Sequence, residues 1–390
     1  MQSMIISAVR TPIGAFQGAL AALTSPRLGA IVIKEAINRA GIQPSDVCEV
    51  IMGNVLTAGV GQAAARQAAI YAGVPDSVPC MTINKVCGSG LKSVMLADQS
   101  IKLGDSEIVV AGGQESMTNA PYMLFKARDG YRMGNGEIVD SMIHDGLWDV
   151  YNNFHMGLAG ELCAEEFNIG KAEQDDYAIM SYTRALDAQK NGWFAEEMVP
   201  VVIEGRKGSV TIDKDEEPEK VNFDKVPSLK PVFKKDGTVT AANASSIDDG
   251  ASAVVVASED VVKSKGLKPL AKILAYATHA QKPEWFTTAP AEAIRKAVEK
   301  ANMKVEDIDL FEINEAFSTV PIITAKKLNI SYDKINIHGG AVSLGHPIGA
   351  SGARILTTLI YALKRTGKKF GCASLCIGGG EAVAMIIESL

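Results

Sequence analysis

Apolar and polar positions along this 390-residue chain repeat one pattern twice. Apolar residues recur at helical spacing over 30–42 and again over 294–303, which predicts two amphipathic helices. Each run is followed by a short turn and an apolar strand, at 47–52 and at 308–313. The two copies keep a constant offset, since Ala301 lies 261 positions after Ala40. The chain therefore contains an internal repeat.

A second pair of matching segments follows in the same order. The strands predicted at 107–115 and 373–381 are both apolar, and both run into glycines. A turn of small residues and an apolar helix precede each strand, with Cys87-Gly88-Ser89-Gly90 before the first and Gly349-Ala350-Ser351-Gly352 before the second. One β/α unit used twice predicts an α/β fold with two pseudo-symmetric halves, whose mixed sheets pack together.

The segment 118–244 has no counterpart in the second half. It combines a predicted helix at 174–190 with glycine-rich turns and a charged stretch at 213–220, which we interpret as a solvated face. An insertion between core elements is a candidate lid or substrate-recognition domain. We therefore expect a first half at 1–117 and 245–268, an inserted loop domain at 118–244 and a second half at 269–390.

Composition and charge narrow the range of functions. The formal net charge of −6 argues against a general nucleic-acid binder. No apolar run reaches the roughly 18 residues that cross a membrane. An apolar strand is predicted at 4–9, almost at the first residue, so we expect a cytoplasmic protein, or a mitochondrial matrix protein whose transit peptide was removed. The six cysteines show neither a Cys-x-x-Cys pair nor zinc-ligand spacing, which favours reduced thiols.

One of these cysteines is predicted at a position that favours a nucleophilic thiolate. Cys87 is predicted on a glycine-flanked turn just before a helix begins. Free N–H groups and the helix dipole at such a turn lower the pKa of a thiol and make it a better nucleophile. By itself the stretch is equally compatible with a small buried residue before a helix.

The second half supplies two further polar groups set among glycines. His346 lies on a turn before another helix, and Cys376 lies at a strand end before Gly378-Gly379-Gly380. Because corresponding loops of a pseudo-symmetric fold can meet, these groups are predicted to converge with Cys87. A cysteine beside a histidine is an activated nucleophile, a second cysteine can move a proton at carbon, and glycine N–H groups can stabilise an oxyanion. Three other histidines, His144, His279 and His338, are interpreted as structural.

Four motifs together resemble the thiolase family, in its branch that forms acetoacetyl-CoA. They are Asn84-Lys85-Val86-Cys87-Gly88-Ser89-Gly90, Asn314-Glu315-Ala316-Phe317, Gly345-His346-Pro347-Ile348-Gly349-Ala350-Ser351-Gly352 and Cys376-Ile377-Gly378-Gly379-Gly380. Their order and spacing along nearly the whole chain are specific. The resemblance implies a layered αβαβα thiolase-like fold with an inserted loop domain that binds coenzyme A.

The resemblance also implies a reaction. This is acetyl-CoA C-acetyltransferase activity, a reversible Claisen condensation of two acetyl-CoA molecules to acetoacetyl-CoA and CoA. Cys87 would carry the acyl group, His346 would help to deprotonate it, and Cys376 would exchange the α-proton. Asn314, through a water, and His346 would form one oxyanion hole for the enolate. The N–H groups of Cys87 and Gly378 would form the other.

Binding residues are implied by similar positions. Coenzyme A contacts are expected at Leu147, His155, Met156, Lys220, Lys225, Phe233, Ala241, Ser245, Phe286, Ala316 and Phe317. A potassium site is expected at Tyr182, Ala241, Ala242, Ala244 and Val342, with no other cofactor required. The partners are acetyl-CoA, acetoacetyl-CoA and CoA, without nucleic acid or membrane, and the assembly is a homotetramer built as a dimer of dimers. Glu381, after the three glycines, is expected to point away from the thiols.

Three alternatives remain open from the sequence. A degradative 3-ketoacyl-CoA thiolase of broader chain length shares the chemistry, and His155-Met156 argues for the short-chain branch instead. A ketoacyl-synthase-type condensing enzyme shares the duplicated fold, but Cys376 and the Asn-Glu-Ala-Phe motif are against it. A non-catalytic, thiolase-like protein that binds acyl-CoA or lipid is the alternative outside enzymes, and it would be expected to lack one of Cys87, His346 and Cys376.

Overall fold

The computed structural model describes residues 2–205 and 208–390, and the strands of its two halves join into one ten-stranded sheet. The order is β14-β15-β16-β13-β1-β12-β5-β3-β4, with the short β2 beside β12. The halves are joined where β1 pairs with β13, over Met4 and Ile5 only. The strands are β1 (Ser3–Arg10), β2 (Gly14–Ala15), β3 (Glu49–Gly53), β4 (Cys80–Ile83), β5 (Ile108–Ser116), β12 (Asp248–Ser258), β13 (Ala271–Ala280), β14 (Leu310–Ile313), β15 (Phe370–Ile377) and β16 (Glu381–Ser389).

Strand directions repeat between the halves. In the first half β3 and β5 are parallel, and β12 and β1 follow as antiparallel neighbours. In the second half β14 and β15 are parallel, and β16 and β13 follow in the same antiparallel way. The predicted duplication of one β/α unit is confirmed.

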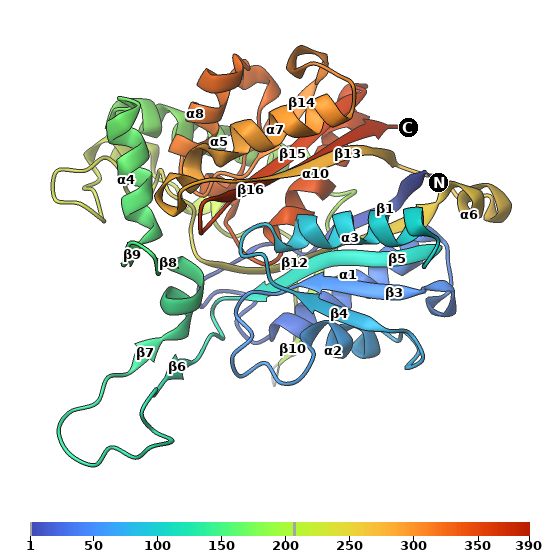
Figure 1. Ribbon diagram of the computed structural model, residues 1–390, viewed down its shortest axis with the longest axis horizontal. Coiled ribbons are helices and arrows are strands. Elements are labelled where there is room, and N and C mark those ends of the chain that lie inside the picture. Colours follow the sequence, from blue (N-terminus) through green and yellow to red (C-terminus); the bar gives the residue numbers. More distant parts are fainter. Residues whose placement is uncertain (1, 206–207) are drawn as a thin grey trace.

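Helices complete five layers (Figure 1). α1 (Ser25–Ala40) and α2 (Ala64–Tyr71) cover the outer face of the first half, and α7 (Ala289–Lys300) and α8 (Thr319–Leu328) cover that of the second. α3 (Ser89–Leu103) and α10 (Ser351–Thr366) lie between the two parts of the sheet, where their apolar side chains form one buried cluster. Because they are covered on both sides, the central helices have a wide apolar surface. The predicted αβαβα order is confirmed.

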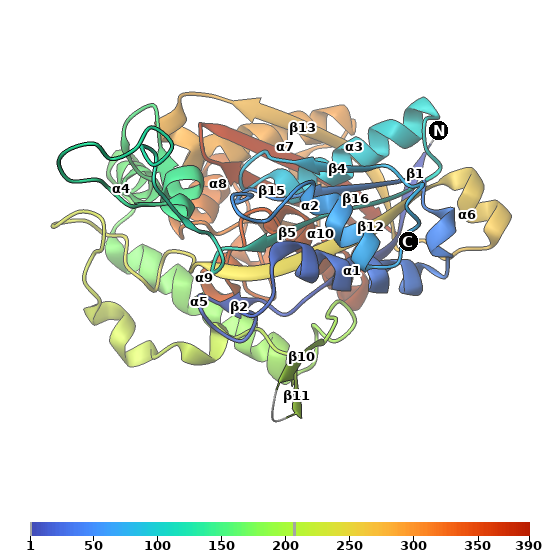
Figure 2. The ribbon, with the colours of Figure 1, turned by 90° about the horizontal axis from the view of Figure 1, so that it is seen from below.

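The segment between β5 and β12 forms the loop domain. Its helices are α4 (Met156–Glu166) and α5 (Lys171–Lys190), and α5 contains the helix predicted at 174–190. The hairpin of β6 and β7 projects from the body in Figure 1, and the hairpin of β10 and β11 projects in Figure 2. The hairpin strands are β6 (Tyr122–Met123), β7 (Val139–Asp140), β8 (Trp148–Asp149), β9 (Phe154–His155), β10 (Val201–Gly205) and β11 (Gly208–Ile212). The exact boundaries of the three predicted segments stay a prediction.

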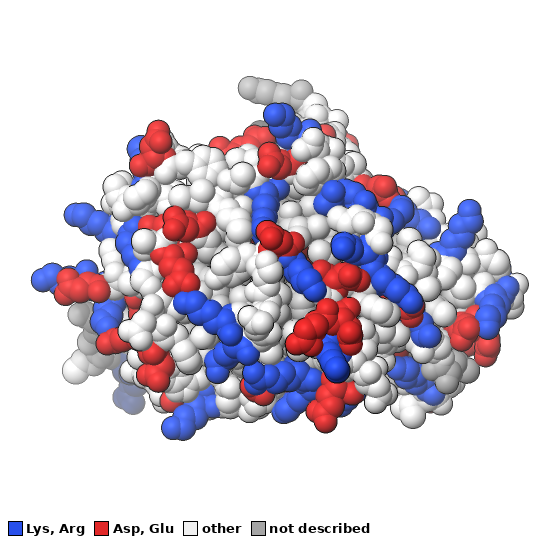
Figure 3. Space-filling model, turned by 90° about the horizontal axis from the view of Figure 1, so that it is seen from above, with Lys and Arg blue, Asp and Glu red and all other residues white. Residues whose placement is uncertain are grey.

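Short helical turns connect these elements. They are η1 (Pro44–Asp46), η2 (Met142–Leu147), η3 (Pro218–Lys220), η4 (Phe223–Ser228), α6 (Glu259–Lys265), η5 (Pro283–Thr288), η6 (Val305–Asp307), η7 (Tyr332–Lys334) and α9 (Ala341–Leu344). None of the helices in the described ranges has the length and apolar character needed to cross a membrane. On the face in Figure 3, basic and acidic side chains are interspersed rather than gathered by sign.

Candidate active site

The two central helices cross where both sequences have glycine. A Cβ atom on Gly90 would lie 2.6 Å from the backbone nitrogen of Ala353, and one on Gly352 would overlap Leu91. Only glycine at both positions allows this approach of the two helix N-termini. The loops that precede α3 and α10 carry Cys87 and His346. The crossing therefore brings these two side chains to one cavity.

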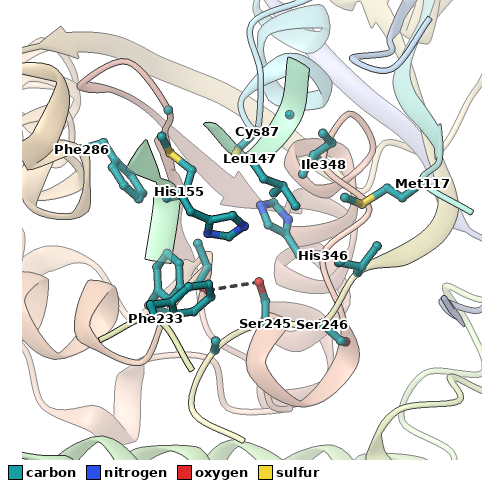
Figure 4. A pocket seen from close by; sticks show the side chains of 17 residues that line it. Cys87, Met117, Leu147, His155, Phe233, Ser245, Ser246, Phe286, His346 and Ile348 are labelled. Atoms are coloured by element: carbon teal, nitrogen blue, oxygen red, sulfur yellow. Dashed lines mark hydrogen bonds between the residues drawn. The ribbon is translucent and has the colours of Figure 1, made fainter. Parts of the chain in front are cut away.

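The cavity has a volume of about 290 Å³ and a mainly apolar wall (Figure 4). His155 and His346 extend into it from different segments of the chain. The predicted site residues that line it are Cys87, Leu147, His155, Met156, Phe233, Ala244, Ser245, Phe286, Ala316, Phe317, His346 and Gly378. Residues from the first half, the loop domain and the second half thus meet at one cleft.

Cys87 lies on a strained turn. Val86 before it has a φ of 45°, a conformation that a β-branched residue rarely adopts. The N–H groups of Gly378 and of Cys87 itself are directed at the sulfur. Burial nevertheless raises the pKa of the Cys87 thiol to about 11, and the nearby Glu115 carboxyl adds to the rise. The prediction of a lowered pKa was wrong, because loss of solvation outweighs the helix terminus and the two N–H groups.

His346 is held as a neutral base. Its backbone N–H donates to Asp248 Oδ2 at 2.8 Å, and its Nδ1 lies 2.6 Å from Ser351 Oγ. Asn314 Nδ2 approaches His346 Nε2 at 3.4 Å as a donor, which leaves Nε2 as the nitrogen without a proton. Burial, together with the positive charge of Arg354, lowers the pKa of His346 to about 3. The imidazole is therefore uncharged near neutral pH, and Nε2 carries the lone pair that a proton would join.

Cys376 and Asn314 lie behind the cavity wall rather than on its surface. Both are fully buried, at the ends of the neighbouring strands β15 and β14, and the Asn314 N–H donates to the Ser374 carbonyl at 2.9 Å. Burial raises the pKa of Cys376, and the charge of the Cys87 thiolate raises it further. Asn314 Oδ1 has no hydrogen-bond partner within the described part of the chain. This oxygen can therefore hold a water.

An aromatic wall closes the loop-domain side of the cavity. His155 caps α4, because its Nδ1 accepts from the Gly157 N–H at 3.1 Å, and Nε2 therefore carries the ring proton. Its ring stacks on Phe233 with 4.8 Å between centroids, and Phe317 contacts both Phe233 and Phe286 edge-on. Burial lowers the pKa of His155. This wall is suited to an uncharged, partly apolar ligand arm.

Some predicted residues lie outside the cavity wall. Lys220 and Lys225 are exposed, and Lys220 pairs with Glu217 at 3.0 Å. Ala241 is also exposed. Of the residues predicted for potassium, Tyr182 and Val342 pack together in one small apolar cluster, while Ala244 lines the cavity.

Sequence reasoning missed five lining residues. Ile348 lies inside the His346 motif, Gly146 precedes Leu147, and Ser246 and Ile247 follow Ser245, so position next to predicted residues was the available signal. Met117 carries no such signal, since only folding brings it to the cleft. No cluster of three or more His, Cys, Asp or Glu side chains with metal-binding geometry occurs in 2–205 and 208–390.

Comparison with known proteins gives consistent matches over the whole chain. Residues 3–260 match the model of the thiolase N-terminal domain and residues 267–389 that of the thiolase C-terminal domain. An acetyl-CoA acetyltransferase of Cupriavidus necator is 52% identical, with 99% of this chain and 98% of that protein covered. The crystal structure of the Bacillus anthracis acetyl-CoA acetyltransferase superposes with a TM-score of 0.98 at 44% identity, covering 100% of this chain and 99% of that one. A thiolase of Ascaris suum in complex with coenzyme A gives 0.95 at 44% identity, with both chains fully covered.

Proposed function

The chain belongs to the thiolase family, and from this premise we propose that it is an acetyl-CoA C-acetyltransferase. It condenses two acetyl-CoA molecules to acetoacetyl-CoA and CoA, and catalyses the reverse cleavage. One observation carries the proposal. The Cys87 sulfur faces the N–H groups of Gly378 and Cys87, in the same cavity as a neutral His346 whose Nε2 can accept a proton.

The first half of the reaction acylates Cys87. His346 Nε2 takes the thiol proton as the sulfur attacks the thioester carbonyl, so no free thiolate has to exist beforehand. The oxyanion of the tetrahedral intermediate lies at the N–H groups of Cys87 and Gly378. The intermediate collapses to acetyl-Cys87, and the departing CoA thiolate takes the proton of Cys376. Cys376 is left as a thiolate beside the imidazolium of His346.

The second half forms the carbon–carbon bond. The Cys376 thiolate removes an α-proton from a second acetyl-CoA, which restores its own thiol. The enolate oxygen accepts hydrogen bonds from His346 Nε2–H and from a water held by Asn314. The α-carbon then attacks acetyl-Cys87, acetoacetyl-CoA is released, and the Cys87 sulfur recovers its proton from His346. Every proton is returned, and no oxidant or reductant is required.

The loop domain binds the coenzyme. The relative from Ascaris suum was solved with coenzyme A, and the aromatic wall of His155, Phe233 and Phe317 provides an apolar channel to Cys87 for the pantetheine arm. Lys220 and Lys225 are exposed cations of the same domain, and we assign them to the coenzyme phosphates. The location, in the cytoplasm or in the mitochondrial matrix after removal of a transit peptide, stays a prediction.

We propose a potassium ion at the turn before Ser245. No hydrogen bond within the described ranges is donated to the carbonyl oxygens of Ala241, Ala242 or Ala244, so these remain available as hard oxygen ligands. The Tyr182 hydroxyl and the Val342 carbonyl complete the proposed set. The ion would order the turn that carries Ser245, which bonds the Ala316 carbonyl at 3.1 Å on the cavity wall.

CoA-dependent cleavage of acetoacetyl-CoA tests the proposed function, measured beside 2-methylacetoacetyl-CoA and a long-chain 3-ketoacyl-CoA. We expect fast turnover of acetoacetyl-CoA that Cys87→Ser abolishes, with an acetyl group found on Cys87 by mass spectrometry. Turnover of the long-chain substrate alone would replace this assignment with the degradative thiolase. Binding of acyl-CoA without turnover of any substrate would favour a non-catalytic thiolase-like protein.

A further inference from the structure

An ion pair joins the two loops that supply the N–H groups around Cys87. The Lys85 ammonium pairs with the Glu381 carboxylate, across 296 positions of sequence. Lys85 precedes Cys87 by two residues, and Glu381 follows Gly378 by three. Neither side chain lines the cavity, so neither touches the reacting atoms. Any effect of the pair on the chemistry has to act through Cys87 and Gly378.

The Cys87 turn needs external support. Between Lys85 and Cys87 stands Val86, with its unfavourable φ of 45°. Two side chains hold this conformation from within the turn: Asn84 Oδ1 accepts from the Val86 N–H at 2.8 Å, and Ser89 Oγ accepts from the Lys85 N–H at 2.8 Å. A residue in a sparsely populated conformation persists only where its surroundings determine it. These two bonds fix the turn internally, but they do not fix it relative to Gly378.

The conformation of the glycine turn that faces Cys87, residues 378–380, likewise depends on how its two ends are held. Gly379 and Gly380 have φ values of 91° and 87°, and around Gly378 a Cβ atom would meet only Met156 Sδ at 3.4 Å and Val86 Cγ1 at 3.8 Å. Three consecutive glycines lose much conformational freedom when they are ordered. At its far end the Gln281 N–H donates to the Gly380 carbonyl at 2.8 Å, and Glu381 follows directly as the first residue of β16, paired with Ile377 of β15 across the turn. The Lys85–Glu381 ion pair ties this end of the glycine turn to the Cys87 turn.

We propose that the Lys85–Glu381 ion pair is a positioning device for the oxyanion hole. It sets the distance and orientation between the N–H group of Cys87 and that of Gly378, on which the acylation step depends. Lys85 and Glu381 are positioning residues, because neither side chain lines the cavity. For its kinetic readout the inference rests on the proposed function.

A long-range charge effect is the competing explanation, and it predicts a different sign. If the pair acted only through its charges, loss of Glu381 would leave Lys85 uncompensated and lower the pKa of Cys87. If the pair instead holds the two loops at a fixed distance, loss of either partner lets Gly378 move away from the sulfur, and the pKa of Cys87 rises. The other titratable groups around Cys87 are Glu115, His155, His346 and Cys376, and they are the same in both cases.

The test compares Lys85→Met, Glu381→Met and the charge-reversed double variant Lys85→Glu/Glu381→Lys. For each single variant we expect kcat to fall about tenfold with an almost unchanged KM for acetyl-CoA, because one oxyanion donor is displaced rather than removed. The double variant should recover most of kcat. Thermal unfolding should barely change, since the side chains are 23% and 37% exposed and such pairs add little stability. Lys263→Met, which removes the surface pair Lys263–Glu259 on α6, is the matched control and should leave kcat unchanged.

A second readout needs no substrate. The rate of Cys87 alkylation by iodoacetamide is followed against pH, and both single variants should shift the profile to higher pH. A shift to lower pH in Glu381→Met, or an unchanged kcat in both single variants, overturns the proposal. If the unaltered chain cleaves no acetoacetyl-CoA, the proposed function fails, and the alkylation profiles still decide whether the pair positions Gly378.

Discussion

Ser351 Oγ lies 2.6 Å from Nδ1 of His346 and donates its only hydrogen to the Pro347 carbonyl at 2.9 Å. The hydroxyl must therefore accept from Nδ1–H, which fixes the tautomer of His346. Nε2 is left without a proton, and its lone pair accepts from Asn314 Nδ2 at 3.4 Å. This nitrogen is the base that Cys87 needs. The first residue of α10 thus orients the base that the preceding loop carries.

We predict that Ser351→Ala lowers kcat about tenfold, because the imidazole then samples the unproductive tautomer and weaker general-base catalysis remains. The KM for acetyl-CoA should change little, since Ser351 does not line the cavity. Steady-state cleavage of acetoacetyl-CoA measures both parameters. Ser93→Ala is the control, because Ser93 Oγ is equally buried in α3 but bonds the Gly90 and Gly112 carbonyls. Ser93→Ala should lower the stability of the fold rather than kcat. Equal losses of kcat in the two variants would contradict the assignment of the tautomer.

The pH dependence of Cys87 alkylation follows from its raised pKa. With a pKa of about 11, the thiolate fraction rises about tenfold per pH unit through pH 10, and alkylation should rise in parallel without a plateau. His346, with a pKa of about 3, stays neutral throughout this range. Glu115, whose pKa burial raises to about 7, gains its charge near neutrality and flattens the rise there.

Mass spectrometry of all six cysteines measures this profile, with and without acetyl-CoA to protect Cys87. A plateau above pH 8 would instead show that a thiolate–imidazolium pair already exists in the free enzyme.

Much of the fold could be predicted because the spacing of apolar residues that indicates it is local in the sequence and occurs twice. The 261-position offset between Ala40 and Ala301 is visible in apolar spacing alone, and it corresponds to α1 and α7 in matching layers. The joining of both halves into one sheet was not predictable in this way. It depends on a two-residue pairing of β1 with β13, and no sequence pattern marks so short a contact.

The candidate active site likewise has features that the sequence indicated and features that it did not. Cys87 and His346 stand in glycine-rich turns before helices, so their place in the chain indicated their convergence. The pKa of Cys87 was predicted with the wrong sign, because burial is a property of the whole fold whereas a helix terminus can be recognised locally. The partner of Glu381 was likewise hidden, since Lys85 lies in the other half.

Gly157 tests the role of the aromatic wall. A Cβ atom at this position would overlap the ring of Phe233, which stacks on His155. We predict that Gly157→Ala displaces Phe233 and raises the KM for CoA about tenfold, with a smaller effect on kcat, because the channel is deformed while Cys87 is untouched. Gly170→Ala is the control, since a Cβ atom there meets nothing within 4 Å and Gly170 has an ordinary φ of −68°. An unchanged KM in Gly157→Ala would remove Phe233 from the coenzyme channel.

Potassium should activate the enzyme through the turn before Ser245. We predict a lower KM for acetoacetyl-CoA in potassium chloride than in sodium chloride of equal concentration, because the larger ion matches a carbonyl-rich site with less loss of hydration. Tyr182→Phe should reduce this difference, since it removes a proposed ligand and keeps the packing against Val342. Equal kinetics in both salts would exclude the ion from the assigned site.

We predict that this chain forms a homotetramer whose two dimers meet at the hairpin of β6 and β7. This hairpin projects from the body, and its apolar side chains are open to solvent, with Phe125 61% and Ile138 68% exposed. Apolar side chains gathered on one projecting segment are typical of an interaction site. We predict that Phe125→Glu/Ile138→Glu converts tetramers to dimers, because charges would be buried in the contact between dimers. Light scattering after size exclusion measures the mass.

Val202→Glu/Val210→Glu, on the hairpin of β10 and β11 with exposures of 53% and 59%, should leave the mass unchanged. If the β10–β11 variant dissociates instead, the tetramer contact lies on that other hairpin.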